Sequence, residues 1–192
     1  MSTLEIIHRW ANIQTSQGYN YLYPTEVSPY AKDKYCGPAV YRWMVWTPGY
    51  GIHAYYVGET ENLARRIQHC IRPGSSQKTN LRLKAYFDEA VNQKQQVELE
   101  TLVFEPFQIN KVQFSMELLG HTHIRRTLEN LVLVWMNAAT PSGVPVILNR
   151  VLAQDKERTN KRIDSALGHL KQLGLTDEQT SRLLETLKIA RR

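Results

Sequence analysis

The sequence is short of the features that mark secreted and membrane-embedded proteins. Its 192 residues include only two cysteines, Cys36 and Cys70, which are too few for a disulfide scaffold and favour a reducing cytoplasm. The longest apolar run, at 131–139, is interrupted by Asn137 and is too short to span a bilayer, and the N-terminus lacks a signal-peptide pattern. We therefore expect a cytoplasmic protein without a membrane partner.

Metal ligands at zinc spacing are also missing. The two cysteines lie far apart, and His121 and His123 are two positions apart in a predicted helix, where such side chains face different ways. A structural zinc site is therefore disfavoured, and we expect no small-molecule cofactor. Internal repeats and low-complexity tracts are absent as well.

What the chain does have is a modest excess of positive charge. Lys and Arg number 24 against 18 Asp and Glu, which gives a net charge of +6. The hydrophobic content of 42% is that of an ordinary globular chain, long enough to bury a core. The basic excess suits a partner that carries phosphate groups, although it does not identify one.

The most informative stretch runs from residue 39 to residue 70. Two runs rich in β-branched and aromatic residues flank a turn marked by Pro48 and two glycines, a pattern that predicts a β-hairpin. Beyond Gly58 the spacing of apolar residues becomes helical, with Leu63 and Ile67 on one face. The stretch thus predicts a hairpin that leads through a glycine into a short helix.

Polar residues within this stretch follow a recognisable order. Tyr41 lies on the first predicted strand, Tyr56 and Gly58 close the second, and Asn62 and Arg66 begin the helix. In this order and spacing the stretch resembles the GIY-YIG nuclease superfamily, which carries two tyrosines, a glycine and an arginine at these places.

The resemblance extends further along the chain. Glu129, in a long helix predicted over 114–136, stands where the superfamily places a glutamate, and Asn149 matches an asparagine often found beyond it. The resemblance implies that Glu129 is the one protein ligand of Mg²⁺ or Mn²⁺. Taken alone, Glu129 would be interpreted as a surface carboxylate paired with Arg125 or Arg126.

Two positions depart from the usual pattern of the superfamily. Cys70 stands one helical turn after Arg66, where His or Tyr is usual, and His69 lies one residue early. Cys70 could act as a nucleophile, but no base is predicted against it, and a small buried hydrophobe is the commoner role. Glu59 follows the glycine where Ser or Lys is commoner, which puts an acid near an anionic substrate.

The resemblance implies a metal-dependent DNA endonuclease that hydrolyses phosphodiester bonds. Its predicted catalytic residues are Tyr41, Tyr56, Arg66 and Glu129, and its predicted supporting residues are Gly58, His69 and Asn149. We assign the general base to Tyr56, which can serve only if nearby cations favour the phenolate, because a free tyrosine has a pKa of about 10.

A run of basic residues without acids lies beside this site. No Asp or Glu occurs from residue 65 to residue 84, and a Ser/Gly loop within the run leads into a helix. This pattern is typical of a surface that follows a phosphate backbone, the alternative being a solvated loop and helix face. The predicted nucleic-acid-binding residues are Arg65, Arg72, Lys78, Arg82 and Lys84.

These elements predict an α/β (α+β) domain over residues 37–150. It would hold a small three-stranded antiparallel sheet flanked by helices, with the third strand over 97–107 and a helix over 81–92. DNA is the predicted partner, and cutting both strands would take a homodimer or two successive visits. A nucleic-acid-binding module with a decayed site is the alternative function.

Two extensions flank this domain. Residues 1–36 predict a short amphipathic helix over 1–15 and an arm rich in tyrosine, which either stacks on bases or packs its rings against the domain. Residues 151–192 predict a helical hairpin that docks on the domain, dimerises or binds DNA. Restriction, repair and mobile-element roles all remain open.

Overall fold

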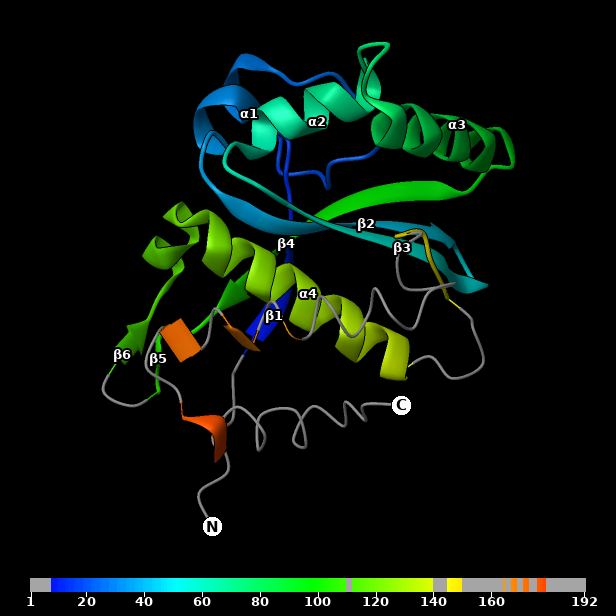
Figure 1. Ribbon diagram of the computed structural model, residues 1–192. Coiled ribbons are helices and arrows are strands. Elements are labelled where there is room, and N and C mark those ends of the chain that lie inside the picture. Colours follow the sequence, from blue (N-terminus) through cyan, green and yellow to red (C-terminus); the bar gives the residue numbers. More distant parts are fainter. Residues whose placement is uncertain are drawn as a thin grey trace.

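A five-stranded sheet forms the centre of the protein in its computed structural model (Figure 1). The strands lie in the order β1-β4-β2-β3-β7, and neighbours are antiparallel except for β3 and β7. Their bounds are β1 His8–Asn12, β2 Ala39–Thr47, β3 Gly51–Thr60, β4 Gln96–Phe104 and β7 Val146–Ile147. The structure describes residues 8–109, 112–139 and 145–149, and beyond these only 164, 167–168, 171–172 and 176–178.

Helices cover both faces of this sheet. Helices α1, α2 and α3 lie on one face and α4 lies on the other (Figure 1). Their bounds are α1 Pro29–Lys34, α2 Leu63–Ile71, α3 Lys78–Asn92 and α4 Thr122–Ala139. Between β4 and α4, strands β5 Phe107–Ile109 and β6 Val112–Phe114 form a separate hairpin. A 3₁₀ helix, η1 Met116–Gly120, follows this hairpin. The predicted mixed α/β class is confirmed.

The prediction of a three-stranded sheet is wrong, because β1 and β7 extend the sheet at its two edges. The helix predicted over 1–15 is a strand from His8 to Asn12, paired antiparallel with β4. The edge of β4 offers unpaired backbone groups, and pairing with them outweighs the weak helix preference of so short a segment. Strand β7 has only two residues, too few to leave a periodic signal in the sequence.

The long helix predicted over 114–136 begins later than expected. The 3₁₀ helix η1 ends at Gly120, and α4 starts only at Thr122. Glycine is unfavourable inside a helix. The carbonyls of Leu119 and Gly120 accept hydrogen bonds from the Arg125 guanidinium at 2.7 and 3.0 Å, which fixes the corner between the two helices.

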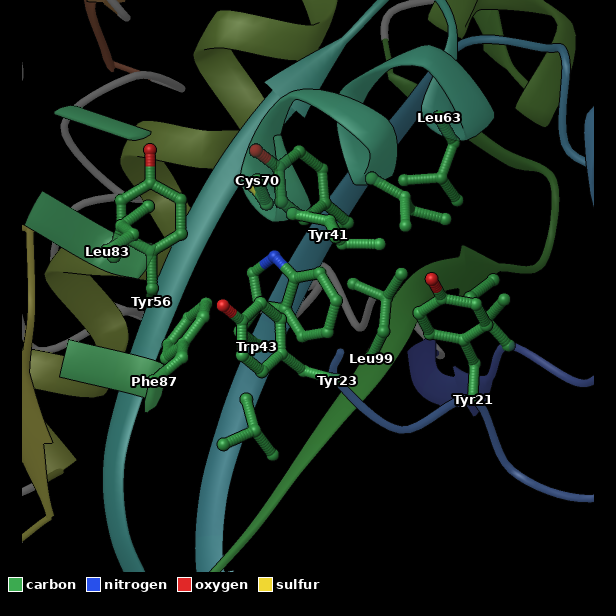
Figure 2. Packing of buried hydrophobic residues seen from close by; sticks show 14 of the residues in the cluster. Tyr21, Tyr23, Tyr41, Trp43, Tyr56, Leu63, Cys70, Leu83, Phe87 and Leu99 are labelled. Atoms are coloured by element: carbon green, nitrogen blue, oxygen red, sulfur yellow. The ribbon is translucent and has the colours of Figure 1, made fainter. Parts of the chain in front are cut away.

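The face beneath α2 and α3 buries most of the aromatic core (Figure 2). Trp43 on β2 packs against Tyr23 and Phe87, with ring centroids 6.3 and 5.4 Å apart. Tyr21 is buried as well, whereas Tyr19 is 70% exposed. The inner part of the tyrosine-rich arm therefore packs against the domain, as one of the two interpretations predicts.

The helical hairpin predicted over 151–192 lies largely outside the described residues. Of these, Asp164 and residues 167–168, 171–172 and 177–178 are helical. Among the helices that the structure describes, none is both long enough and apolar enough to cross a bilayer.

Candidate active site

The tyrosines of the predicted site stand on neighbouring strands at one end of the β2–β3 hairpin. Tyr41 of β2 lies opposite Gly58 of β3, and its ring fills the space beside that glycine. A β-carbon on Gly58 would lie 2.5 Å from Tyr41 Oη and 2.6 Å from Cζ. Close-packed interiors do not tolerate such distances, so only glycine lets the fully buried Tyr41 keep its place.

Arg66 joins the hydroxyl groups of both tyrosines. Helix α2 begins at Leu63, after the Asn62 side chain caps its first turn. This start places Arg66 one turn into the helix, where Nε donates to Tyr41 Oη at 2.6 Å and Nη2 donates to Tyr56 Oη at 3.3 Å. The hairpin and the helix are thereby connected through a single guanidinium.

Among the described residues, the partners of the partly buried Arg66 guanidinium are both neutral. Within the part of the chain that the structure describes, no carboxylate forms an ion pair with it. A partly desolvated charge without a counter-ion is unfavourable. The position is therefore suited to an anionic ligand.

Burial controls the protons of the two phenols. Loss of solvation raises the pKa of Tyr41 well above its ordinary value and also raises the pKa of Tyr56, and the Arg66 guanidinium lowers both without outweighing burial. Near neutral pH both hydroxyls therefore stay protonated. The condition set for Tyr56 as a base, a pKa lowered by nearby cations, is not met in the protein alone.

Glu129 stands on α4, the helix on the sheet face opposite α2 (Figure 1). It lies half-buried on α4, and its negative charge adds to the larger effect of burial in raising the pKa of Tyr56. The carboxylate and the phenol therefore interact electrostatically. The alternative partner Arg125 directs its guanidinium to Glu59 instead.

Asn149 holds the strand that carries Tyr56. Its Nδ2 donates to the Val57 carbonyl at 2.7 Å, and its Oδ1 accepts from the Val57 N–H at 2.9 Å. The preceding N–H of Leu148 donates to the Tyr55 carbonyl at 2.7 Å. The buried amide therefore continues the pairing of β7 with β3 by one more step, next to Tyr56.

His69 and Cys70 follow Arg66 on α2 in different surroundings. Cys70 is fully buried, and burial raises the pKa of its thiol, which favours packing over nucleophilic chemistry. The half-buried side chain of His69 forms no hydrogen bond or ion pair among the described residues. No polar contact among those residues therefore supports its predicted role.

No family model, curated protein or solved structure matches the chain. The chemistry of the site must follow from its own side chains.

A metal held by one carboxylate fits these side chains better than a multi-ligand centre does. His121 and His123 do not face different ways as predicted, because α4 begins only after His121, and their ring centroids lie 5.5 Å apart. Even so, the described residues contain no group of three or more His, Cys, Asp or Glu that could hold a metal. Glu129 alone suits a hard ion such as Mg²⁺, which keeps most of its water ligands.

Most of the predicted phosphate-binding cations already have partners within the protein. Ion pairs form between Arg65 and Glu61, between Arg72 and Glu26, and between Lys84 and Asp88, and Arg82 Nη2 donates to the Leu148 carbonyl at 2.9 Å. The acids come from outside the basic run, so the sequence pattern did not reveal them. Exposed ion pairs are weak, about 0–1 kcal/mol, and can yield to phosphate. Lys78, exposed at the start of α3, forms none among the described residues.

Proposed function

We propose that the protein is a metal-dependent DNA endonuclease of the GIY-YIG type. The observation that carries this proposal is the Arg66 guanidinium, which is partly buried, bonded to two neutral phenols and without a carboxylate partner among the described residues. A phosphodiester would supply the missing negative charge. Glu129 on α4, whose charge raises the pKa of Tyr56, adds a carboxylate of the kind that holds Mg²⁺ or Mn²⁺.

Arg66 binds and orients the scissile phosphate in this scheme. Its Nε is anchored on Tyr41, so the guanidinium is fixed before the phosphate arrives. A water oxygen attacks phosphorus, the bond from phosphorus to the 3′ oxygen breaks, and Arg66 stabilises the charge that develops on the phosphoryl oxygens. When bound at Glu129, the metal ion supplies positive charge that polarises the phosphate and stabilises the leaving 3′ oxygen.

Tyr56 is the base that we assign to the attacking water. Its phenolate oxygen would take one proton as the water attacks, and the leaving 3′ oxygen takes a proton from solvent. Because burial raises the pKa of Tyr56, only a small share of the molecules carries the phenolate near neutral pH. The rate of cleavage should therefore increase with pH.

Cleavage assays on four variants test this function. Plasmid, single-stranded and branched DNA are incubated with the protein in Mg²⁺ or Mn²⁺, with EDTA as the metal-free control. Arg66→Ala and Glu129→Gln should lower the cleavage rate by at least about 100-fold while DNA binding is kept. Matched controls are Lys32→Ala, an exposed cation on α1, and Glu89→Gln, an exposed carboxylate on α3.

Two results would overturn the proposal. One is a wild-type protein that cuts none of the three DNA forms in either metal, which would leave the non-catalytic binding module. The other is undiminished cleavage by Glu129→Gln, which would remove the metal ligand from the scheme.

A further inference from the structure

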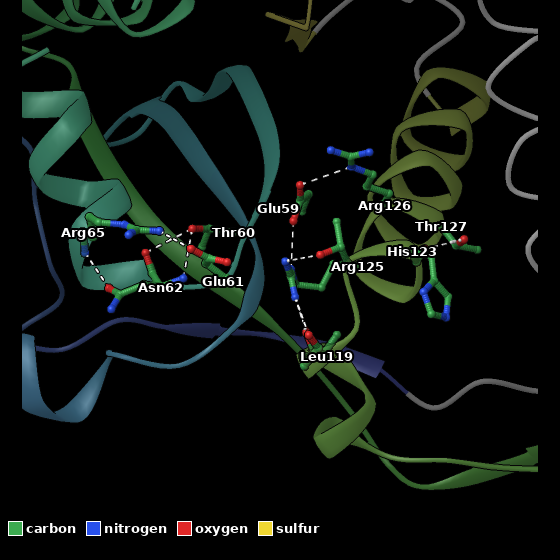
Figure 3. A network of polar contacts seen from close by, with 12 residues as sticks. Glu59, Thr60, Glu61, Asn62, Arg65, Leu119, His123, Arg125, Arg126 and Thr127 are labelled. Atoms are coloured by element: carbon green, nitrogen blue, oxygen red, sulfur yellow. Dashed lines mark hydrogen bonds and ion pairs between the residues drawn. The ribbon is translucent and has the colours of Figure 1, made fainter. Parts of the chain in front are cut away.

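Glu59 connects the end of β3 to α4 through two arginines (Figure 3). Its Oε2 accepts a hydrogen bond from Arg125 Nε at 2.8 Å, and its Oε1 lies 3.6 Å from Arg126 Nε. The Arg125 side chain is 3% exposed, whereas that of Arg126 is 63% exposed. The pair with Arg125 is thus the short and buried one, and buried charges depend far more on their partners than exposed ones do.

Arg125 in turn holds the corner at which α4 begins. Besides its bonds to the carbonyls of Leu119 and Gly120, its Nη2 donates to Thr122 Oγ1 at 3.2 Å. Among the described residues, Glu59 is the only carboxylate within ion-pair distance of this guanidinium. Without Glu59 the buried positive charge would keep neutral acceptors only, and the corner would have to move or admit water.

The ion pair lies close to the candidate site on both elements. Glu59 follows Gly58 directly and is three residues beyond Tyr56, a distance of about 10 Å along a strand. Arg125 precedes Glu129 by four residues, about 6 Å along a helix and on the same helix face. Although Glu59 and Tyr56 point to opposite faces of the strand, the pair ties β3, which carries Tyr56, to α4, which carries Glu129.

We propose that the Glu59–Arg125 ion pair is a positioning device that fixes the Glu129 carboxylate relative to Tyr56 and thereby sets the metal affinity of the site. This inference rests on the proposed function, and it gives Glu59 a role that does not involve contact with DNA. Two guanidinium groups neutralise the Glu59 carboxylate, so the acid that follows Gly58 does not repel an anionic substrate as its place in the sequence suggests.

Mn²⁺ binding tests the inference without requiring cleavage. We would measure the Mn²⁺ dissociation constant of the full chain by electron paramagnetic resonance, together with single-turnover cleavage, DNA affinity and thermal unfolding. Glu59→Gln keeps the shape of the side chain but removes its negative charge. It should weaken Mn²⁺ binding and slow cleavage by about 10–100-fold each, as substitutions of residues that orient a metal ligand typically do. DNA affinity should stay within about twofold, because Glu59 does not contact DNA in this scheme and the basic residues from 65 to 84 are untouched.

Two further variants separate the position of the Glu59 carboxylate from its charge, and its buried partner from its exposed one. Glu59→Asp keeps the charge on a side chain one methylene shorter, so Mn²⁺ binding should remain weakened if position is what matters. Arg126→Gln removes the exposed partner of Glu59 and keeps the buried one, so Mn²⁺ affinity should stay within about twofold of the wild type.

The outcomes distinguish this inference from the proposed function. Unchanged Mn²⁺ affinity in Glu59→Gln, below its melting temperature, overturns the inference even if the variant is less stable, since the pair would then be structural only. A wild type that binds Mn²⁺ through Glu129 but cuts no DNA overturns the proposed function alone. A wild type that binds no Mn²⁺ overturns both.

Discussion

Replacing Gly58 with alanine tests the packing of the site directly. The new carbon would lie 2.5 Å from Tyr41 Oη, 2.6 Å from Cζ and 3.0 Å from Cε1. Carbon atoms pack at about 3.5–4.0 Å, so the phenol ring or the strand must shift by roughly 1 Å. Tyr41 is fully buried on β2, a central strand of the sheet, so no open space relieves the contact.

Two effects follow from this shift. Overpacking a core costs about 1–3 kcal/mol, which lowers the melting temperature of a chain of this size by roughly 2–12 °C. Displacing Tyr41 also weakens its 2.6 Å bond from Arg66, and hydrogen bonds to charged groups contribute about 1.5–3 kcal/mol. Because Arg66 loses its anchor, cleavage should fall further than the loss of stability alone explains.

Thermal unfolding and single-turnover plasmid cleavage measure these two effects separately. Gly37→Ala is the matched control, because a β-carbon there meets no atom within 4 Å and the glycine has no positive φ. At such open positions alanine is neutral or stabilises by up to about 1 kcal/mol. If Gly58→Ala melted at the same temperature as Gly37→Ala, the packing argument would be refuted.

Three further predictions concern the base and the DNA surface. The rate of single-turnover cleavage should rise about tenfold per pH unit from about pH 7 to about pH 9, because Tyr56 acts only when ionised and its pKa is raised. A rate that levels off in this range would exclude Tyr56 as the base. Tyr56→Phe should lower that rate by at least about 100-fold with little change in melting temperature, and comparable turnover would assign the base to another group. For DNA binding, Lys78→Ala should flatten the slope of log K against log salt by about 0.9. Arg82→Ala should instead lower the melting temperature, because the Arg82 guanidinium donates to the Leu148 carbonyl. Equal changes of slope in the two variants would show that Arg82 binds phosphate.

The hairpin and the helix that follows it could be predicted because their signals are local. Glycines mark the turn, β-branched and aromatic residues mark the strands, and the capping Asn62 marks the start of α2. These short connections are enough to bring Tyr41, Gly58 and Arg66 together, so the sequence spacing already contains this part of the geometry. Helix α3 and strand β4 also follow from their periodicity.

The rest depends on pairings between distant segments, which periodicity does not encode. His8–Asn12 becomes a strand because the β4 edge is open to it, and nothing within those five residues requires that. Glu59 looked like an acid facing the substrate because its partner Arg125 lies on α4, across the sheet. Burial likewise raises the pKa of Tyr56, and that burial comes from residues distant in the sequence that pack around it.

The order of the site's parts along the chain has a consequence for synthesis. The phenols and the guanidinium come from one continuous stretch, whose contacts are near in sequence and can form early. The carboxylate on α4 and the amide of Asn149 leave the ribosome much later, because chains are made from the N-terminus. In the proposed scheme a growing or truncated chain could therefore hold a phosphate but could not cut DNA until α4 and Asn149 had joined the sheet.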